Sequence, residues 1–468
     1  MVIQLALLLW VPITIGLFLV LRPHRATAIS FIAGLSLLPS LRSFNVPVLP
    51  DLDQSSIPTL TCFFMSMFMA RNRMISSGIG RGPEILIALM ILGALATNLT
   101  NMDPVVYGAN VLAPMSVVDT VYDAAWMVIL WGLPFYLGRA LVRTATEARE
   151  VLVVLAIAGL LHVPFILVEL VTGPLFHRLV YGSYPSMFTF AQSIKFGGFR
   201  PVVLMNHGLT LSVFMLYSTI AWLTLAKAKR GVIGVPNTPV VGGLIVVLAL
   251  CKSVAVYLYG LVALPILYLF KPKFQLAICA MIAVIVLGYP TLRATGVVPV
   301  EEMQGFAEEQ VGGVAARSMM ARLTTEDEIL ARVRNRIVFG WGGNARYQIF
   351  DPVTGQPLST LDGLWVIVIG EGGAVRFFLL FLLMLYPVFY AYRKIHLIPS
   401  LPVQYLICGM AWIVAIRAFD LLPNSGGEAY LTFFSGAMYG VTKFQVARAK
   451  SARLKKQERR ARSYQPSA

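Results

Sequence analysis

The chain has 468 residues, of which 57% are hydrophobic and only 13% are charged, and its mean hydropathy is +0.75. These values exclude an ordinary soluble globular protein, because so apolar a chain needs a lipid environment to cover it. The formal net charge of +16 would suit a nucleic-acid-binding protein, but the distribution of the charges along the chain argues against that class.

Apolar runs recur along the whole chain and predict membrane-spanning helices. A helix of about 20 apolar residues crosses the hydrocarbon core and satisfies all of its own backbone hydrogen bonds there. The first run has no small-residue cleavage site before the basic segment 22–25, so we interpret it as a spanning helix and not as a signal peptide. About thirteen spans are predicted, at residues 2–21, 26–41, 57–70, 84–99, 123–141, 151–171, 203–226, 237–251, 253–270, 273–291, 364–391, 401–419 and 428–444.

Lys and Arg concentrate in alternate loops, which predicts the topology. Basic loops remain in the cytoplasm, and the positions concerned are Arg22, Arg25, Arg71, Arg73, Arg81, Arg139, Arg143, Arg149, Lys227, Lys229, Arg230, Lys271, Lys273, Arg393 and Lys394, together with the basic tail after residue 446. The other loops, at 43–56, 100–122, 172–202, 292–363 and 420–427, are then external. A basic tail of this kind is typical of a solvated segment attracted to anionic lipid, so no nucleic-acid partner is expected.

We therefore predict an all-α, polytopic integral membrane protein with about 12–13 transmembrane helices and one long external loop that carries short helices. The predicted divisions are N-terminal spans at 1–291, the external loop at 292–363, C-terminal spans at 364–445 and the basic tail at 446–468. Four cysteines (Cys62, Cys251, Cys279 and Cys408) lie in or beside apolar runs without metal-ligand spacing. They predict buried small side chains, with neither a disulfide nor a metal site.

The long external loop is the main polar, Arg- and Gly-rich insert. Thr325 with Glu328 matches a capping box and predicts the start of an amphipathic helix through Ile337. The glycines at 340–343 are expected to end that helix. Arg332 and Arg336 are four residues apart, so they share one helix face.

Several short motifs follow one another in a characteristic order. They are Arg200-Pro201, Lys252-Ser253 at a tight external hairpin, Phe339-Gly340-Trp341-Gly342, Leu361-Asp362 and Glu371-Gly372. In this order and topology the chain resembles the O-antigen ligase and O-antigen polymerase superfamily of bacterial envelope glycosyltransferases, in detail over residues 200–390. The resemblance implies transfer of a glycan from an undecaprenyl-pyrophosphate carrier to a sugar acceptor on the periplasmic face of the bacterial inner membrane.

Two departures from the family pattern bear on the reaction. Lys252 stands where the family usually has Arg, and it offers a point charge in place of a bidentate fork. The ligase branch has a histidine in the large external loop, whereas residues 292–363 contain none. This favours polymerisation of O-antigen or exopolysaccharide repeat units over ligation to lipid A core, with a chain-length regulator and a flippase as possible partners beside the membrane lipids.

Departure of a lipid pyrophosphate develops negative charge that the protein must stabilise. The external loops contain no acidic cluster with hard-cation spacing, so neither metal nor cofactor is expected. We predict that Arg200, Lys252, Arg336 and Arg346 converge on the pyrophosphate, with Gly340, Gly342 and Gly343 adding backbone N–H groups and Trp341 stacking on sugar. The alternative is that these Arg and Trp residues only anchor the membrane interface.

Three residues are candidates for activating the acceptor hydroxyl. Asp362 is either a catalytic acid–base group or the N-cap of the helix that follows it. Glu371, two turns into that helix, is either a general base or the ion-pair partner of Arg376 or Arg417. His207 either orients the donor or acceptor or packs between helices.

A lipid-linked glycan flippase or another secondary carrier is the competing class. Such carriers usually contain internal repeats and bind substrate near the bilayer midplane, whereas here no repeat is visible and the cations gather at one face. A non-enzymatic scaffold would leave the Arg-rich loop unexplained.

Overall fold

The computed structural model of the protein describes residues 2–40, 43–77, 82–108, 110–185, 190–229, 234, 236–296, 313–351, 353–358, 362–426 and 428–463. Helices dominate these ranges, and their strands form three two-stranded antiparallel hairpins. The prediction of an all-α polytopic architecture is confirmed.

A helix or a closely spaced helix pair occupies each predicted span. In chain order the helices are α1 (Val2–Val20), α2 (Pro23–Leu37), α3 (Ser56–Met69), α4 (Arg71–Ser77), α5 (Glu84–Leu99), α6 (Val117–Met127), α7 (Leu133–Leu141), α8 (Ala145–Thr172), α9 (Phe176–Tyr181), α10 (Gly208–Lys227), α11 (Asn237–Leu250), α12 (Val254–Leu269), α13 (Pro272–Ala294), α15 (Gly313–Val333), α16 (Leu364–Lys394), α17 (Leu401–Asp420) and α18 (Glu428–Ser463). The hairpins are β1 (Phe44–Val46) with β2 (Leu49–Leu52), β3 (Val105–Tyr107) with β4 (Asn110–Leu112), and β5 (Ile194–Lys195) with β6 (Gly198–Phe199).

Within the described ranges, seven helical segments are long and apolar enough to cross a membrane. They are α1, the continuous segment Val117–Leu141, α8, α10, α13, Leu364–Leu397 and α17, and the four shorter apolar helices are α3, α5, α11 and α12. The chain is therefore a multi-pass membrane protein.

Local sequence explains where several helices begin. Thr144 and Glu147 form a capping box at the start of α8, and Ser116 and Asp119 form one at the start of α6. Between α6 and α7 the backbone widens to a π-helical turn at Val128–Gly132, directly before Pro134. Proline has no N–H to donate to the carbonyl four residues earlier, which favours this wider turn.

Glycines allow α7 and α18 to pack closely at the centre of the bundle. A Cβ atom on Gly138 would lie 2.1 Å from the Phe433 carbonyl oxygen, and one on Gly436 would lie 2.0 Å from that of Phe135. Gly440 follows Gly436 by four residues and faces the Val142 carbonyl. In a membrane, where water does not drive helices together, such small residues let van der Waals contact hold the helices.

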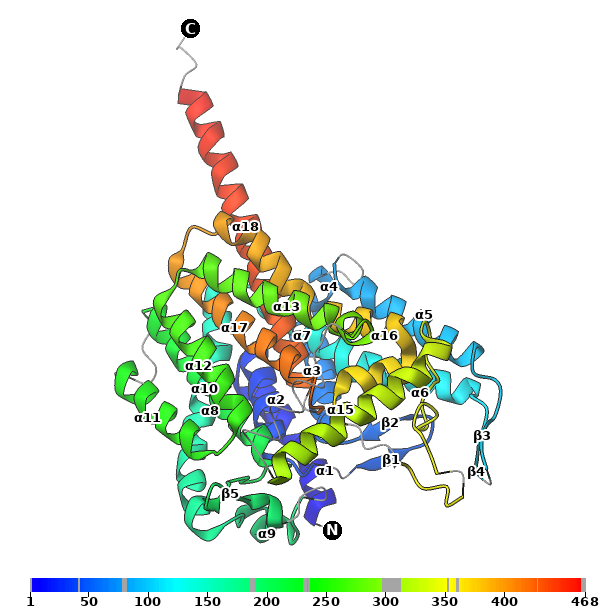
Figure 1. Ribbon diagram of the computed structural model, residues 1–468. Helices are drawn as coiled ribbons and strands as arrows, with labels where there is room; N and C mark the ends of the chain where they lie inside the picture. The colour runs from blue at the N-terminus through cyan, green and yellow to red at the C-terminus, as the bar shows by residue number, and fades with distance from the viewer. Residues whose placement is uncertain are drawn as a thin grey trace.

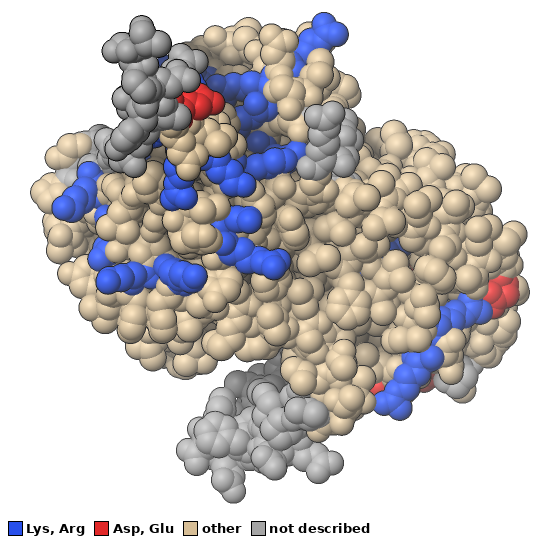
Figure 2. Space-filling view, turned by 90° about the horizontal axis from the view of Figure 1, so that it is seen from above, with Lys and Arg blue, Asp and Glu red and all other residues tan. Residues whose placement is uncertain are grey.

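The two faces of the bundle differ in structure and charge. The hairpins, α9 and α15 lie on the face where the chain begins, and the C-terminal half of α18 projects from the opposite face (Figure 1). Seen from the side of the α18 end, the surface carries many Lys and Arg side chains and few acidic ones (Figure 2). The described parts of the loops at 43–56, 100–122, 172–202 and 292–363, which the sequence predicts to be external, thus share one face.

Two helix starts differ from the prediction. Thr325 lies inside α15, which already runs from Gly313, so the capping-box pattern at Thr325–Glu328 does not start a helix. The span predicted from residue 203 begins at Gly208, because the preceding residues form a loop that is held by side chains described below. Leu361 of the Leu361-Asp362 motif lies outside the described residues.

Candidate functional site

Arg200 is presented by the tight hairpin of β5 and β6. Two residues with positive φ, Phe196 (50°) and Gly197 (67°), make its turn, as short hairpins require. The Arg200 N–H then donates to the Ser193 carbonyl at 2.6 Å. These bonds fix the backbone from which the arginine side chain leaves.

Glu169, at the end of α8, holds the segment that follows Arg200. One carboxylate oxygen accepts from the N–H groups of Leu175 (2.8 Å) and Phe176 (3.0 Å), and the other accepts from those of Val202 (2.8 Å) and Val203 (2.7 Å). Glu169 is fully buried, and four backbone donors satisfy a carboxylate that water does not reach. Glu169 therefore acts as a positioning residue for Arg200.

The Arg200 guanidinium lies against the N-terminus of α10. A Cβ atom on Gly208, the first residue of that helix, would lie 2.7 Å from Arg200 Nε. Arg200 is 6% exposed, and its guanidinium has no hydrogen-bond or acidic partner among the described residues. Burial lowers the pKa of Arg200. A buried cation beside the positive end of a helix dipole is unfavourable unless an anion joins it.

Lys252 and Lys195 add positive charge to the same place. Lys252 lies between α11 and α12 with φ of +53°, and its Nζ is 2.5 Å from the position of a Cβ on Gly198 in the Arg200 hairpin. The pKa of Lys195 is lowered by burial and then by the charge of Arg200. We call Arg200, Lys252, Lys195 and His207 the Arg200 cluster.

His207 is the N-cap of α10 and adjoins Gly208. Its Nδ1 accepts from the Leu209 N–H at 3.1 Å, which places the proton of the neutral ring on Nε2. His207 thus lies at the end of α10 and not inside the helix. It stands at the helix end that faces Arg200.

Arg336 and Arg346 belong to a second group of residues around Trp341. The guanidiniums of Arg332 and Arg336 lie over the Trp341 ring, 4.0 and 4.5 Å from its centroid. Arg336 also donates to the Thr100 carbonyl and pairs with Asp103, both at 2.7 Å. The Arg336 hydrogen bond holds the pKa of Asp103 below its ordinary value.

Arg346 is fully buried, and all three of its guanidinium nitrogens are used. They donate to the carbonyls of Trp341 (3.1 Å), Ala113 (2.5 Å) and Asp103 (2.7 Å). Arg336 and Arg346 therefore hold the loop between α5 and α6 against the segment 334–348 that follows α15. Their donors are committed to protein groups, in contrast to those of Arg200.

The glycine-rich segment also makes structural contacts. The N–H groups of Trp341 and Gly342 donate to the carbonyls of Gly370 (2.9 Å) and Glu371 (2.8 Å), and that of Gly340 donates to Arg336 (2.8 Å). The expectation that Gly340 and Gly342 offer N–H groups to phosphate is therefore wrong. Gly343 shows no such bond among the described residues.

Glu371 forms an intramembrane ion network with two other side chains. Its carboxylate lies 3.2 Å from Arg376 Nη1, while Arg376 Nη2 makes a shorter pair, 2.7 Å, with Asp123 of α6. One guanidinium thus pairs with two carboxylates. The Glu371 carboxylate is the more exposed of the two. Of the partners predicted for Glu371, Arg376 is the one observed, because Arg417 pairs with Asp420.

Asp362 lies directly before the start of α16 but does not cap it. The N-cap is Gly363, without a side-chain cap, and the Leu364 N–H donates to the carbonyls of Leu421 and Asn424, both at 3.0 Å. The junction of α17 and α18 therefore supplies the acceptors at this helix start. The N-cap alternative for Asp362 is wrong.

The four predicted cations do not converge on one point. Arg200 follows β6, next to β5, whereas Arg336 and Arg346 hold the loop that carries β3 and β4, and Figure 1 places these hairpins far apart on the same face. Arg200 and Lys252 come together, and so do Arg336, Arg346 and Trp341. Among the described residues, no group of three or more His, Cys, Asp or Glu side chains is placed to hold a metal ion.

Sequence reasoning missed Glu169, Asp103 and Asp123. An acidic residue at the end of an apolar run, as at 169, is costly in a membrane unless a partner meets it, and this signal could have singled out Glu169. Asp103 lies in a polar loop and carried no comparable signal.

The chain is thus a multi-pass helical membrane protein with a cationic cluster at one end of its helices, in which Arg200 is buried and the other members are half-buried. Comparison with protein-family models gave no match, and a search of curated proteins also found no similar chain.

Proposed function

We propose that the protein transfers a glycan from an undecaprenyl-pyrophosphate-linked donor to a sugar acceptor, without a metal, on the periplasmic face of the bacterial inner membrane. The reaction is polymerisation of O-antigen or exopolysaccharide repeat units. The observation that carries the proposal is the Arg200 guanidinium, 6% exposed, without an acidic partner among the described residues and packed on the start of α10.

Pyrophosphate is an anion that could satisfy the positive charge and hydrogen-bond donors of the Arg200 cluster. Arg offers phosphate two parallel hydrogen bonds, Lys252 adds a point charge, and the first N–H groups of α10 favour an anion. The cluster lies at the end of apolar helices, where the headgroup of a lipid carrier lies when its polyprenyl chain is in the membrane.

The cluster would stabilise the leaving group of the reaction. An acceptor hydroxyl oxygen attacks the anomeric carbon, the bond from that carbon to the phosphate oxygen breaks, and undecaprenyl pyrophosphate leaves with the bonding electrons. Arg200 and Lys252 offset the negative charge that develops on it. The hydroxyl proton goes to a base, and His207 is the candidate here, because it adjoins Gly208, against which Arg200 packs.

The roles of the other predicted residues change accordingly. Arg336, Arg346 and Trp341 join the segment after α15 to the loop between α5 and α6, Glu371 pairs with Arg376, and Asp362 precedes α16. Glu371 would be the base if the acceptor is bound beside Trp341, because Trp341 is hydrogen-bonded to Gly370, the neighbour of Glu371.

Binding of undecaprenyl pyrophosphate to the purified protein tests the proposal. Arg200→Gln should weaken binding by about ten- to a hundredfold, since it removes a charged hydrogen-bonding group from a site with little water. Gly208→Ala, which forces Arg200 aside, should have a similar effect. Arg178→Gln, an exposed arginine on α9, is the matched control and should bind normally, and excess EDTA should leave glycan transfer intact.

The glycan phenotype of a deletion strain tests the reaction itself. Loss of long chains with single repeat units retained identifies a polymerase, whereas lipid-linked polymer that accumulates without surface attachment identifies a ligase. Unchanged carrier binding by both Arg200→Gln and Gly208→Ala, with Arg178→Gln equally unchanged, would contradict the assignment of the pyrophosphate site.

A further inference from the structure

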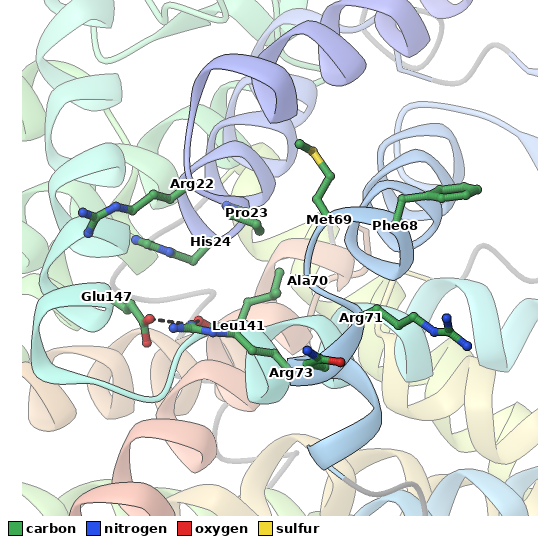
Figure 3. A pocket seen from close by; sticks show the side chains of 11 residues that line it. Arg22, Pro23, His24, Phe68, Met69, Ala70, Arg71, Arg73, Leu141 and Glu147 are labelled. Atoms are coloured by element: carbon green, nitrogen blue, oxygen red, sulfur yellow. Dashed lines mark hydrogen bonds and ion pairs between the residues drawn. The ribbon is translucent and has the colours of Figure 1, made fainter.

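A cavity of about 470 Å³ lies where three helix-to-helix turns meet. Arg22, Pro23 and His24 come from the turn between α1 and α2, residues 68–73 come from the turn between α3 and α4, and Leu141 and Glu147 come from the junction of α7 and α8 (Figure 3). These turns contain basic loops that the sequence assigns to the cytoplasm, so the cavity is remote from the Arg200 cluster. Its volume is in the range of small-ligand sites.

The acidic groups at this cavity are already neutralised. One Glu147 oxygen pairs with Arg73 at 2.5 Å, and the other accepts from the N–H groups of Arg143 and Thr144, both at 2.9 Å. The neighbouring Glu150 binds His24 and Arg25. Little negative charge is left for further cations.

Arg22 and Arg71 therefore provide a surplus of positive charge. Neither has a hydrogen-bond or ion-pair partner for its guanidinium among the described residues. Figure 3 shows them on opposite sides of the cavity with their guanidiniums directed away from each other. Arg22 is also the N-cap of α2, which has no side-chain cap, so the positive end of a helix dipole faces the same place. Both arginines line the cavity, so an anion held in it has a guanidinium on each of two walls.

The rim of the cavity is apolar and exposed. Phe68, which lines it, is 82% exposed and Met69 is 48% exposed, while Leu19 and Val20, just before Arg22, are 68% and 83% exposed. A soluble anion gains nothing from such side chains, but an acyl chain does. Because α1 is a candidate membrane span, this rim lies where a span meets the lipid headgroups.

We propose that this cavity binds the phosphate headgroup of an anionic phospholipid in the leaflet on the side of the α18 C-terminus. Arg22 and Arg71 contact the phosphate, and the acyl chains lie along Phe68 and Val20. The site does not depend on the glycan-transfer reaction proposed above.

Native mass spectrometry of the full-length protein in detergent, titrated with phosphatidylglycerol, tests the site. Arg22→Gln and Arg71→Gln should each weaken the tightest lipid-binding step about fivefold, and the double variant about twenty-fivefold, from the attraction of one basic side chain to an anionic lipid surface. Arg393→Gln, an exposed arginine in the last turn of α16, is the matched control and should retain wild-type affinity. Phe68→Ser should also weaken lipid binding.

Two further titrations separate a lipid from a soluble ligand. Phosphatidylcholine should bind more weakly than phosphatidylglycerol, and free glycerol phosphate should not compete at equal concentration. Competition by glycerol phosphate, with no effect of Phe68→Ser, would show a soluble phosphate ligand and overturn the proposal. An equal loss of affinity in Arg393→Gln would overturn it as well, because binding would then follow only the total charge.

Discussion

Arg200 and Arg346 are both almost fully buried, yet they differ in which of their hydrogen-bond donors remain available to a ligand. Arg346 is inaccessible and donates to three backbone carbonyls, whereas Arg200 is 6% exposed with no guanidinium partner among the described residues. A buried donor without an acceptor costs about 1–3 kcal/mol, and more when it is charged. That cost makes Arg200, and not Arg346, the better candidate for binding an anion.

Glu326 in α15 shows a second effect of burial. Its carboxyl group lies 3.6 Å from Arg293 and accepts from the Trp365 indole N–H at 3.4 Å. Desolvation nonetheless dominates and raises the pKa of Glu326 to about 7. The folded protein therefore holds this proton more tightly than the unfolded chain does, and ionisation of Glu326 destabilises the fold.

We predict that Glu326 makes stability fall as pH rises from its ordinary pKa of 4.5 to about 7. The unfolded chain releases the proton in that window while the folded protein keeps it, so the free energy of unfolding decreases. Glu326→Gln removes this dependence, and its melting temperature relative to wild type should rise between pH 5 and pH 8. A constant difference across that range would contradict the assignment.

At the scale of elements, α16 is bent where it contacts the segment 334–348 that follows α15. Gly373 has a φ of +66° inside the helix, and the Ala374 and Val375 N–H groups donate to the carbonyls of Ile337 (2.8 Å) and Val338 (3.2 Å). The kink thus exposes backbone donors that an unbroken helix would use internally. Gly340 meets this kink, and its conformation there requires glycine: φ is +68°, and a Cβ would lie 2.6 Å from Glu371 backbone atoms.

Gly340→Ala is therefore expected to destabilise the protein strongly. The new methyl group would meet backbone that cannot rotate away, and the residue would be strained at positive φ, which together cost on the order of 3 kcal/mol. Gly343→Ala is the matched control, because a Cβ there has nothing within 4 Å. Yield and melting temperature in detergent measure the difference. Equal stability of the two variants would show that the segment does not dock on α16 in this way.

At the scale of the molecule, the fold separates two faces. The hairpins, α9 and α15 occupy the face where the chain begins, and the opposite face, from which α18 projects, is rich in Lys and Arg (Figures 1 and 2). Basic loops are retained in the cytoplasm during insertion. The bundle is therefore expected to present the Arg200 cluster outside and the basic tail inside.

Reporter fusions after Arg317 and after Arg453 measure this orientation. We expect a periplasmic signal from the first, which lies in α15, and a cytoplasmic signal from the second, which lies in the C-terminal part of α18. The reverse pair of signals would place the Arg200 cluster in the cytoplasm and exclude a periplasmic reaction.

The sequence alone determined the all-α membrane class and the order and approximate ends of the apolar helices, because apolar run length is a local property that the membrane selects directly. It predicted about thirteen spans, whereas seven described segments are long and apolar enough to cross a membrane and four apolar helices are shorter. It also singled out Arg200, Lys252 and His207, which the fold brings into one cluster. Two predicted helix starts are wrong. The start of α10 is shifted by tertiary contacts of the preceding loop, and the capping pattern at Thr325 lies inside the longer helix α15.

The tertiary structure alone decided which cations remain free for a ligand. Arg336 meets Asp103 across 233 residues of sequence, and Glu169 meets Val202 and Val203 across more than thirty. Such partners cannot be read from spacing, because any of many carboxylates and carbonyls on the same face could satisfy a given donor. Only the packing of the helices selects among them, and it consumes the donors of Arg336 and Arg346 while it leaves the Arg200 guanidinium buried at the end of α10.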